Sequence, residues 1–135
     1  MKILFIGPLL PGSTTLQRCD ALSELGHEVT RLDSSNPVFS IFKKIINKLF
    51  YILNIHYDWT NVNKKLKLIL NKKEIDLVWI EKGLKIKPSS IMKFKNYKNL
   101  KFISYSCDDM MIKQNQSKDY LNSISLYDIH LTTKS

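Results

Sequence analysis

Short apolar runs, separated by polar or glycine-containing segments, organise the first third of the chain. Residues 2–6 (KILFI) stop at a Gly-Pro pair and predict a buried strand. A helix is expected next, with Ser13 or Thr14 as its N-cap and Gly26 as its C-terminal stop. Its apolar positions recur at helical spacing: Leu16, Cys19, Leu22 and Leu25. Residues 27–33 (HEVTRLD) predict a second strand, so the unit is βαβ with a parallel sheet and a right-handed crossover.

Two consecutive amphipathic patterns follow, at 38–73, where a regular alternation of strands and helices needs only one. The apolar face of the first pattern is Ile41, Phe42, Ile45, Ile46, Leu49, Ile52 and Leu53. The second pattern repeats this face with Val62, Leu66, Ile69 and Leu70. Because both have the helical period, we expect an inserted helical pair at about 38–73.

Alternation then resumes to the end of the chain. Apolar strands are expected at 76–80, 101–106 and 128–133, with a short helix at 88–94 and a short helix or turn at 117–125. Near-continuous apolar strands between helices are typical of a parallel sheet covered on both faces. The predicted fold is therefore α/β: a Rossmann-like three-layer sandwich with about five parallel strands in the order 2-1-3-4-5.

Length and composition limit the classes of protein that fit. A chain of 135 residues has room for one domain, 1–135, and its 44% hydrophobic and 24% charged residues are ordinary for a soluble globular chain. No apolar run is long enough to span a membrane, and the first residues favour a strand over a signal peptide. Cys19 and Cys107 lie far apart, which argues against a disulfide framework or a zinc site. We expect reduced thiols and a cytoplasmic location.

The net charge of +9 allows two interpretations. It attracts phosphate, nucleic acid or an anionic membrane surface, or it reflects a background bias towards Lys, Asn and Ile. Lys43, Lys44 and Lys48 flank the first apolar helical face, so this helix is a candidate for peripheral contact with the inner face of an anionic membrane. The alternative is a helix packed on the sheet with its lysines in water. No nucleic-acid readout motif is present, and no specific nucleic-acid partner is expected.

Candidate chemistry lies where the strands end, because parallel sheets bind ligands outside the carboxyl ends of their strands. The first loop, GPLLPGST, has the two glycines of a phosphate loop but Ser13 in place of the required lysine, so ATP hydrolysis is not expected. Gly12, Ser13 and Thr14 are candidates for substrate binding at a helix N-terminus. The alternative is a tight turn that Ser13 caps.

Two adjacent carboxylates follow the strand at 101–106. A carboxylate in a partly dry crevice can act as a general base towards a hydroxyl, which makes Asp108 and Glu81 the catalytic candidates. Loop solvation or capping is the alternative for both. Further substrate-binding candidates on the same rim are Lys82, Gly83, Asp109, Thr133 and Lys134. No histidine or cysteine spacing indicates a metal site.

Four sequence blocks resemble a known family. The opening MKILFIGPLLPGSTTLQRCDALSELGHEVTRLD resembles the amino terminus of GT-B glycosyltransferases, with its LGHEV turn. The blocks DLVWIEKGLKIKP, FISYSCDDMM and YDIHLTTKS resemble the CgeB-like branch (spore maturation protein type), which is related to the family-four glycosyltransferases. The resemblance covers nearly the whole chain, but only the amino-terminal half of such an enzyme.

This resemblance implies an acceptor-binding domain whose partner is a carboxyl-terminal GT-B domain on the same or a separate chain. That second domain would bind the nucleotide-sugar donor, so no cofactor is expected on the present domain. The acceptor would be a glycan or another hydroxyl compound. The full-length parent would be an enzyme, whereas the 135 residues alone would not transfer sugar.

A non-catalytic α/β binding or regulatory module is the alternative. A receiver-like domain also has five strands and places a lysine after the last one, where Lys134 stands. It requires an acidic pair after the first strand, however, and Gly7 and Pro8 occupy that place.

Overall fold

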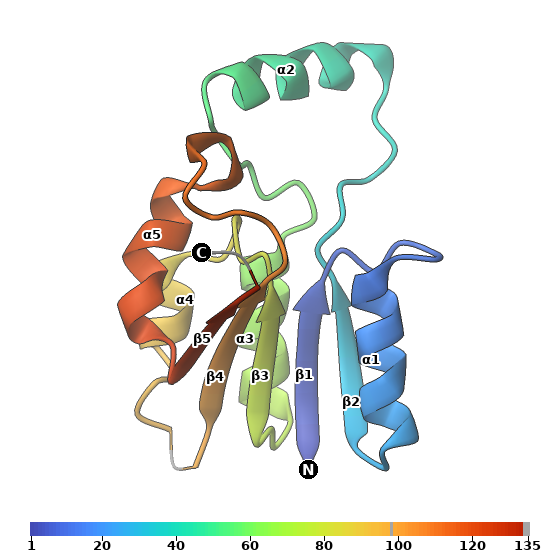
Figure 1. The fold of residues 1–135 in the computed structure, drawn as a ribbon, viewed down its shortest axis with the longest axis vertical. Helices are drawn as coiled ribbons and strands as arrows, with labels where there is room; N and C mark the ends of the chain where they lie inside the picture. The colour runs from blue at the N-terminus through green and yellow to red at the C-terminus, as the bar shows by residue number, and fades with distance from the viewer. Residues whose placement is uncertain (98, 134–135) are drawn as a thin grey trace.

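The computed structural model describes residues 1–97 and 99–133, which form one parallel sheet with helices around it (Figure 1). The strands are β1 (Lys2–Gly7), β2 (Glu28–Asp33), β3 (Leu77–Glu81), β4 (Lys101–Ser106) and β5 (Ile129–Thr132). The helices are α1 (Thr14–Glu24), α2 (Ile41–Ile52), α3 (Val62–Lys72), α4 (Pro88–Met92) and α5 (Lys118–Ser123), with 3₁₀ turns η1 (Lys113–Asn115) and η2 (Ile124–Leu126). Every pairing is parallel and the order is β2-β1-β3-β4-β5, which confirms the predicted fold class and topology.

Local sequence explains the limits of α1. Ser13 is the N-cap, and its side-chain oxygen accepts a hydrogen bond from the amide of Leu16. The chain leaves the helix through Gly26, whose φ of +86° suits glycine. Cys19 is buried as the helical pattern predicts, but Leu25, expected on the same face, is exposed because it is the C-cap and lies past the last turn.

The main core lies on the face of the sheet opposite α1. Figure 1 shows α3 and α4 on this face, with α1 on the other. Alternate strand residues such as Ile6, Val78 and Phe102 point into this layer and are fully buried. They pack with apolar residues of α3 and α4, including Leu66 and Ile91.

The face of the sheet that carries α1 is unevenly covered. Strand register places Phe5, Trp79, Ile103 and Ile129 in one row across this face. Phe5, close to α1, is buried, whereas Ile129 at the sheet edge is 49% exposed. Among the helices in the described part of the chain, only α1 lies on this face, so its β4–β5 half is open to solvent.

Helix α2 does not belong to either layer. It stands beyond the carboxyl ends of the strands, and none of its residues is buried (Figure 1). Helix α3, in contrast, is the ordinary crossover helix between β2 and β3, with Val62, Leu66 and Leu70 in the core. Of the two helices predicted at 38–73, α2 is therefore the extra element, and it does not pack on the sheet.

Candidate functional site

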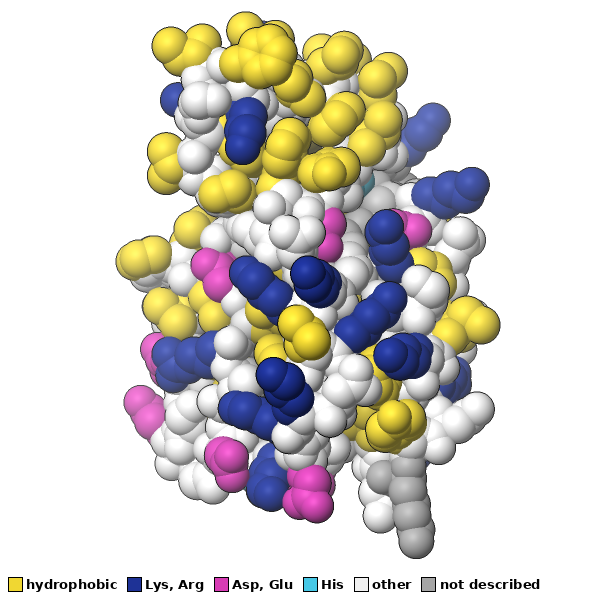
Figure 2. Space-filling model, turned by 180° about the vertical axis from the view of Figure 1, so that it is seen from behind, with side chains coloured by type: hydrophobic (Ala, Val, Ile, Leu, Met, Phe, Trp, Pro, Cys, Tyr) yellow, Lys and Arg dark blue, Asp and Glu magenta, His cyan; other side chains and the backbone are white. Residues whose placement is uncertain are grey.

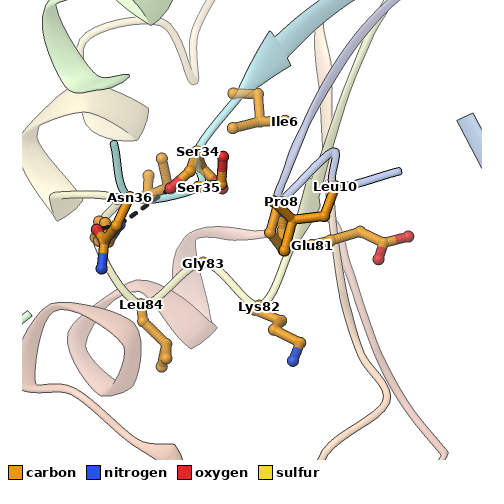
Figure 3. A pocket seen from close by; sticks show the side chains of 12 residues that line it. Ile6, Pro8, Leu10, Ser34, Ser35, Asn36, Glu81, Lys82, Gly83 and Leu84 are labelled. Atoms are coloured by element: carbon orange, nitrogen blue, oxygen red, sulfur yellow. Dashed lines mark hydrogen bonds between the residues drawn. The ribbon is translucent and has the colours of Figure 1, made fainter. Parts of the chain in front are cut away.

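A pocket of about 250 Å³ lies at the carboxyl ends of β1, β2 and β3 (Figure 3). The chain passes from β1 to β2 on one side and places β3 on the other, so strand order reverses here. Ligands of open α/β sheets bind at such reversal points because the two flanking loops diverge. The pocket walls come mainly from the loop after β1, residues 34–36 after β2, and residues 81–86, which begin with the last residue of β3.

Asp33 fastens two of these loops together. Its carboxylate accepts hydrogen bonds from the amides of Leu9, at 3.1 Å, and Ser35, at 2.8 Å. The Ser35 hydroxyl donates a third, also at 2.8 Å. Burial alone would raise the pKa of Asp33, but the hydrogen bonds from Ser35 and Leu9 outweigh it and bring the pKa below its ordinary value.

This hydrogen bonding predicts an acid-dependent contribution to stability. A lowered pKa in the folded state stabilises the protein above the unfolded value of 3.8, and the gain is lost as pH falls through the folded pKa. The Asp33→Asn variant should be less stable than the parent by about 1 kcal/mol at pH 7, since water screens part of the carboxylate. The difference should shrink as pH falls below 3.8 and through the lower folded-state pKa of Asp33.

Urea denaturation at several pH values measures this difference. The exposed Glu24→Gln variant is the control and should follow the parent at every pH. A deficit in Asp33→Asn that does not change with pH would contradict the assigned role of the carboxylate.

Lys85 supplies a positive charge in the pocket wall. Its ammonium group donates to the carbonyl oxygen of Ser34, at 3.0 Å, and to the side-chain oxygen of Asn36. Burial lowers its pKa, with Asp58 and Asp33 nearby opposing the shift. Both hydrogen-bond acceptors are neutral, so a hydroxyl-rich or anionic ligand could take their place at the ammonium group.

Lys82 and Asp108 join the rim across the ends of β3 and β4. The lysine nitrogen lies 2.9 Å from the Asp108 carboxylate, and both side chains are more than a third exposed. This hydrogen bond raises the pKa of Lys82. Asp109 instead accepts from the amide of Met111, so the two neighbouring carboxylates have different partners, one on the rim and one in a turn.

Glu81 faces α1 and is 2% exposed. Its carboxylate accepts from the Thr15 hydroxyl at 2.8 Å and from two Arg18 nitrogens at 2.6 and 2.8 Å. In Figure 3 the carboxylate points away from the side of the pocket that holds Ser34 and Asn36. This geometry favours a positioning role, which ties β3 to α1, over the predicted catalytic role.

The candidates of the first loop lie outside the pocket wall. Ser13 caps α1, and its hydroxyl lies 3.5 Å from the Pro8 carbonyl. Gly12 has a φ of +75°, as the turn before the helix requires. Thr14 is the exposed first residue of α1. The described contacts of these three residues are those of a capped turn.

The remaining predicted residues have separate positions. Gly83 lines the pocket and is buried, and a Cβ atom there would lie 3.2 Å from the Tyr127 hydroxyl, which explains the absence of a side chain. Thr133 donates to the carbonyl of Cys107 beyond β4. Lys134 lies outside the described residues.

Sequence reasoning missed the residue that holds the third pocket loop. The side chain of Asn63, on α3, donates to the Lys85 carbonyl at 2.7 Å and accepts from the Lys87 amide at 2.8 Å. It also bonds Asp58 and Ser90. An asparagine in an amphipathic helix gives no such signal. The pocket residues 34–36, in contrast, directly follow the end of a strand and could have been selected on that basis.

Comparisons of the chain with protein-family models, with curated proteins and with solved structures find no match. The assignment of a Rossmann-like parallel α/β fold with strand order 2-1-3-4-5 therefore rests on the structure alone. Within residues 1–97 and 99–133, no group of three or more His, Cys, Asp or Glu side chains is placed to hold a metal ion.

Proposed function

We propose that the chain is the acceptor-binding, amino-terminal domain of a GT-B glycosyltransferase of the CgeB-like type. The observation that carries the proposal is the pocket at the strand-order reversal, with Lys85 and residues 34–36 in its wall. The four sequence blocks that resemble this family support the reaction type, which is transfer of a sugar to an acceptor hydroxyl. The nucleotide-sugar donor would be held by a carboxyl-terminal domain, and no cofactor is assigned to the present one.

The pocket surface is mainly apolar with a few polar groups, a lining that suits a sugar ring whose hydroxyls meet those groups. Ser34, Ser35 and Asn36 offer hydroxyl, amide and carbonyl groups for hydrogen bonds to acceptor hydroxyls, and Lys85 can neutralise an acidic substituent. Asp108 is our candidate for the general base. It would have to exchange its ion pair with Lys82 for an acceptor hydroxyl, which its partial exposure permits.

A receiver-like regulatory domain is the second candidate, because its five parallel strands have the same order. The strand ends do not suit phosphoryl transfer to an aspartate. β1 ends at Gly7 and is followed by Pro8, without the acidic pair, and the last residue of β3 is Glu81, which is buried against Arg18. Labelling of an aspartate by acetyl phosphate would favour the receiver.

An NMR titration tests the acceptor role. The ¹⁵N-labelled chain is titrated with a neutral oligosaccharide, a sugar phosphate and UDP-glucose in separate samples. We expect acceptor-type ligands to shift amides of residues 33–36 and 82–86, with UDP-glucose no better than a sugar phosphate. Lys85→Met should weaken the sugar-phosphate interaction by roughly tenfold, the usual effect of losing one charged hydrogen bond.

Lys87→Met is the matched control, since it removes the same charge from an exposed position two residues away. It should leave the binding constant within about twofold of the parent. Preferred binding of UDP-glucose, or shifts confined to other parts of the sheet, would reject the acceptor role.

A further inference from the structure

Helix α2 presents an apolar stripe to the outside of the molecule. Ile41, Ile45, Leu49 and Ile52 have helical spacing and are 80%, 64%, 53% and 69% exposed. Figure 2 shows hydrophobic side chains gathered at this end of the molecule. Exposed apolar area of this kind is uncommon on an isolated soluble domain and marks a contact surface.

The opposite side of α2 is already occupied. Trp59, in the loop after the helix, donates its indole N–H to Asn47 at 3.1 Å. Its ring also packs with the ring of Phe50, with 6.1 Å between the ring centroids. The Lys43 ammonium nitrogen lies 5.9 Å from the centroid of the Trp59 ring. Because these contacts fix which side of the helix faces the domain, the apolar stripe is held outward.

Positive charge surrounds the stripe. The sequence has no Asp or Glu between Asp33 and Asp58, while Lys44 and Lys48 lie on α2 itself. Lys113 and Lys118 line a hollow together with the carboxyl-terminal end of α2. An outward apolar stripe with lysines at its border matches the pattern of helices that lie in the interface of an anionic bilayer.

We propose that α2 docks this domain onto an anionic lipid bilayer, with Ile41, Ile45, Leu49 and Ile52 in the acyl boundary. Lys44 and Lys48 then contact lipid headgroups, their alkyl stems lying along the apolar surface. No helix in the described part of the chain is long and apolar enough to cross a membrane. A second copy of the chain fits this surface less well, since it would bring the lysines of two strongly basic molecules together.

Docking also orients the pocket. Helix α2 stands beyond the carboxyl ends of the strands, the same end of the sheet that holds the pocket (Figure 1). A docked domain therefore turns that end towards the bilayer, where a membrane-bound acceptor would be presented. The docking itself does not depend on the proposed function, because it follows from α2 alone.

Vesicle co-sedimentation with the 135-residue chain tests the proposal. The vesicles are phosphatidylcholine alone or phosphatidylcholine mixed with phosphatidylglycerol. We expect binding to the anionic vesicles, weakened by roughly tenfold or more in Ile45→Glu/Ile52→Glu and in Lys44→Ala/Lys48→Ala. Added salt should weaken binding of the parent chain as well.

Matched controls lie on α3. Leu68→Glu changes a half-exposed apolar residue there, and Lys64→Ala/Lys65→Ala removes two exposed lysines. The affinity of both variants for anionic vesicles should be within about twofold of that of the parent chain. Circular dichroism checks that each variant is folded, which is expected because α2 buries no residue and the three α3 positions are exposed. Equal recovery with neutral and anionic vesicles would overturn the proposal. So would a stable dimer in sedimentation velocity that Ile45→Glu/Ile52→Glu abolishes.

Discussion

Replacement of Glu81 by alanine is expected to lower the free energy of unfolding by about 3 kcal/mol. The substitution leaves the buried Thr15 hydroxyl and the Arg18 guanidinium without the acceptor that both now share. Loss of one partner of a buried ion pair costs about 3–5 kcal/mol, and the lower end applies because the Arg18 side chain is 29% exposed. Urea denaturation at pH 7 measures the change.

Asp108→Ala is the comparison for this prediction. Asp108 is also a carboxylate paired with a cation at the end of a strand, but 39% of its side chain is exposed. Pairs of this kind contribute at most about 1 kcal/mol, because water screens the charges and replaces the lost partner. Equal losses for Glu81→Ala and Asp108→Ala would show that burial does not set the strength of the Glu81 contacts.

A loss of about 3–4 kcal/mol is also expected for Asn63→Ala. The Asn63 side chain makes four hydrogen bonds, donating to Asp58 and to the Lys85 carbonyl, and accepting from the Lys87 amide and the Ser90 hydroxyl. Its removal takes the partner from one buried group, the Ser90 hydroxyl, and three partly buried ones, each at a cost of about 1–3 kcal/mol, with water recovering part of the total. Urea denaturation measures the loss.

Hydrogen exchange supplies a second measurement for Asn63. The Lys87 amide donates its hydrogen bond to the Asn63 side chain. In Asn63→Ala its protection from hydrogen exchange should fall by more than the loss of global stability accounts for. Asn71→Ala makes the same change at an exposed position of the same helix and should alter stability by no more than about 0.5 kcal/mol. Unchanged exchange at Lys87 would show that Asn63 does not hold the pocket loop.

Local pattern predicted the elements of this fold well. The strand expected at 101–106 is β4 without change, and α1 is capped by Ser13, one of the two N-cap candidates, Ser13 and Thr14. The last strand is shorter than expected, at Ile129–Thr132 in place of 128–133. These features depend on residues within one or two turns of the chain, so sequence periodicity captures them.

The candidate site was predicted only in part. The sequence placed the candidates at the carboxyl ends of the strands, and two of them, Lys82 and Gly83, line the pocket found there. Lys85 was missed, because its partners Ser34 and Asn36 are about fifty residues away and lie beside it only through the order of β2, β1 and β3. The sequence also contained no signal that Glu81 is a buried ion-pair partner whereas Asp108 is partly exposed on the rim.

The sequence by itself determined the succession of strands and helices, the parallel sheet and the basic, amphipathic character of α2, since each depends on the spacing of side chains along the chain. Tertiary structure decided which polar groups are buried, as in the Glu81–Arg18 pair, and which apolar ones are not, as in the outward stripe of α2. The reason is that burial depends on what lies opposite a side chain. In both cases the neighbouring residues, or their absence, depend on parts of the chain that are distant in sequence. Only strand order and register determine whether such parts lie close together in space.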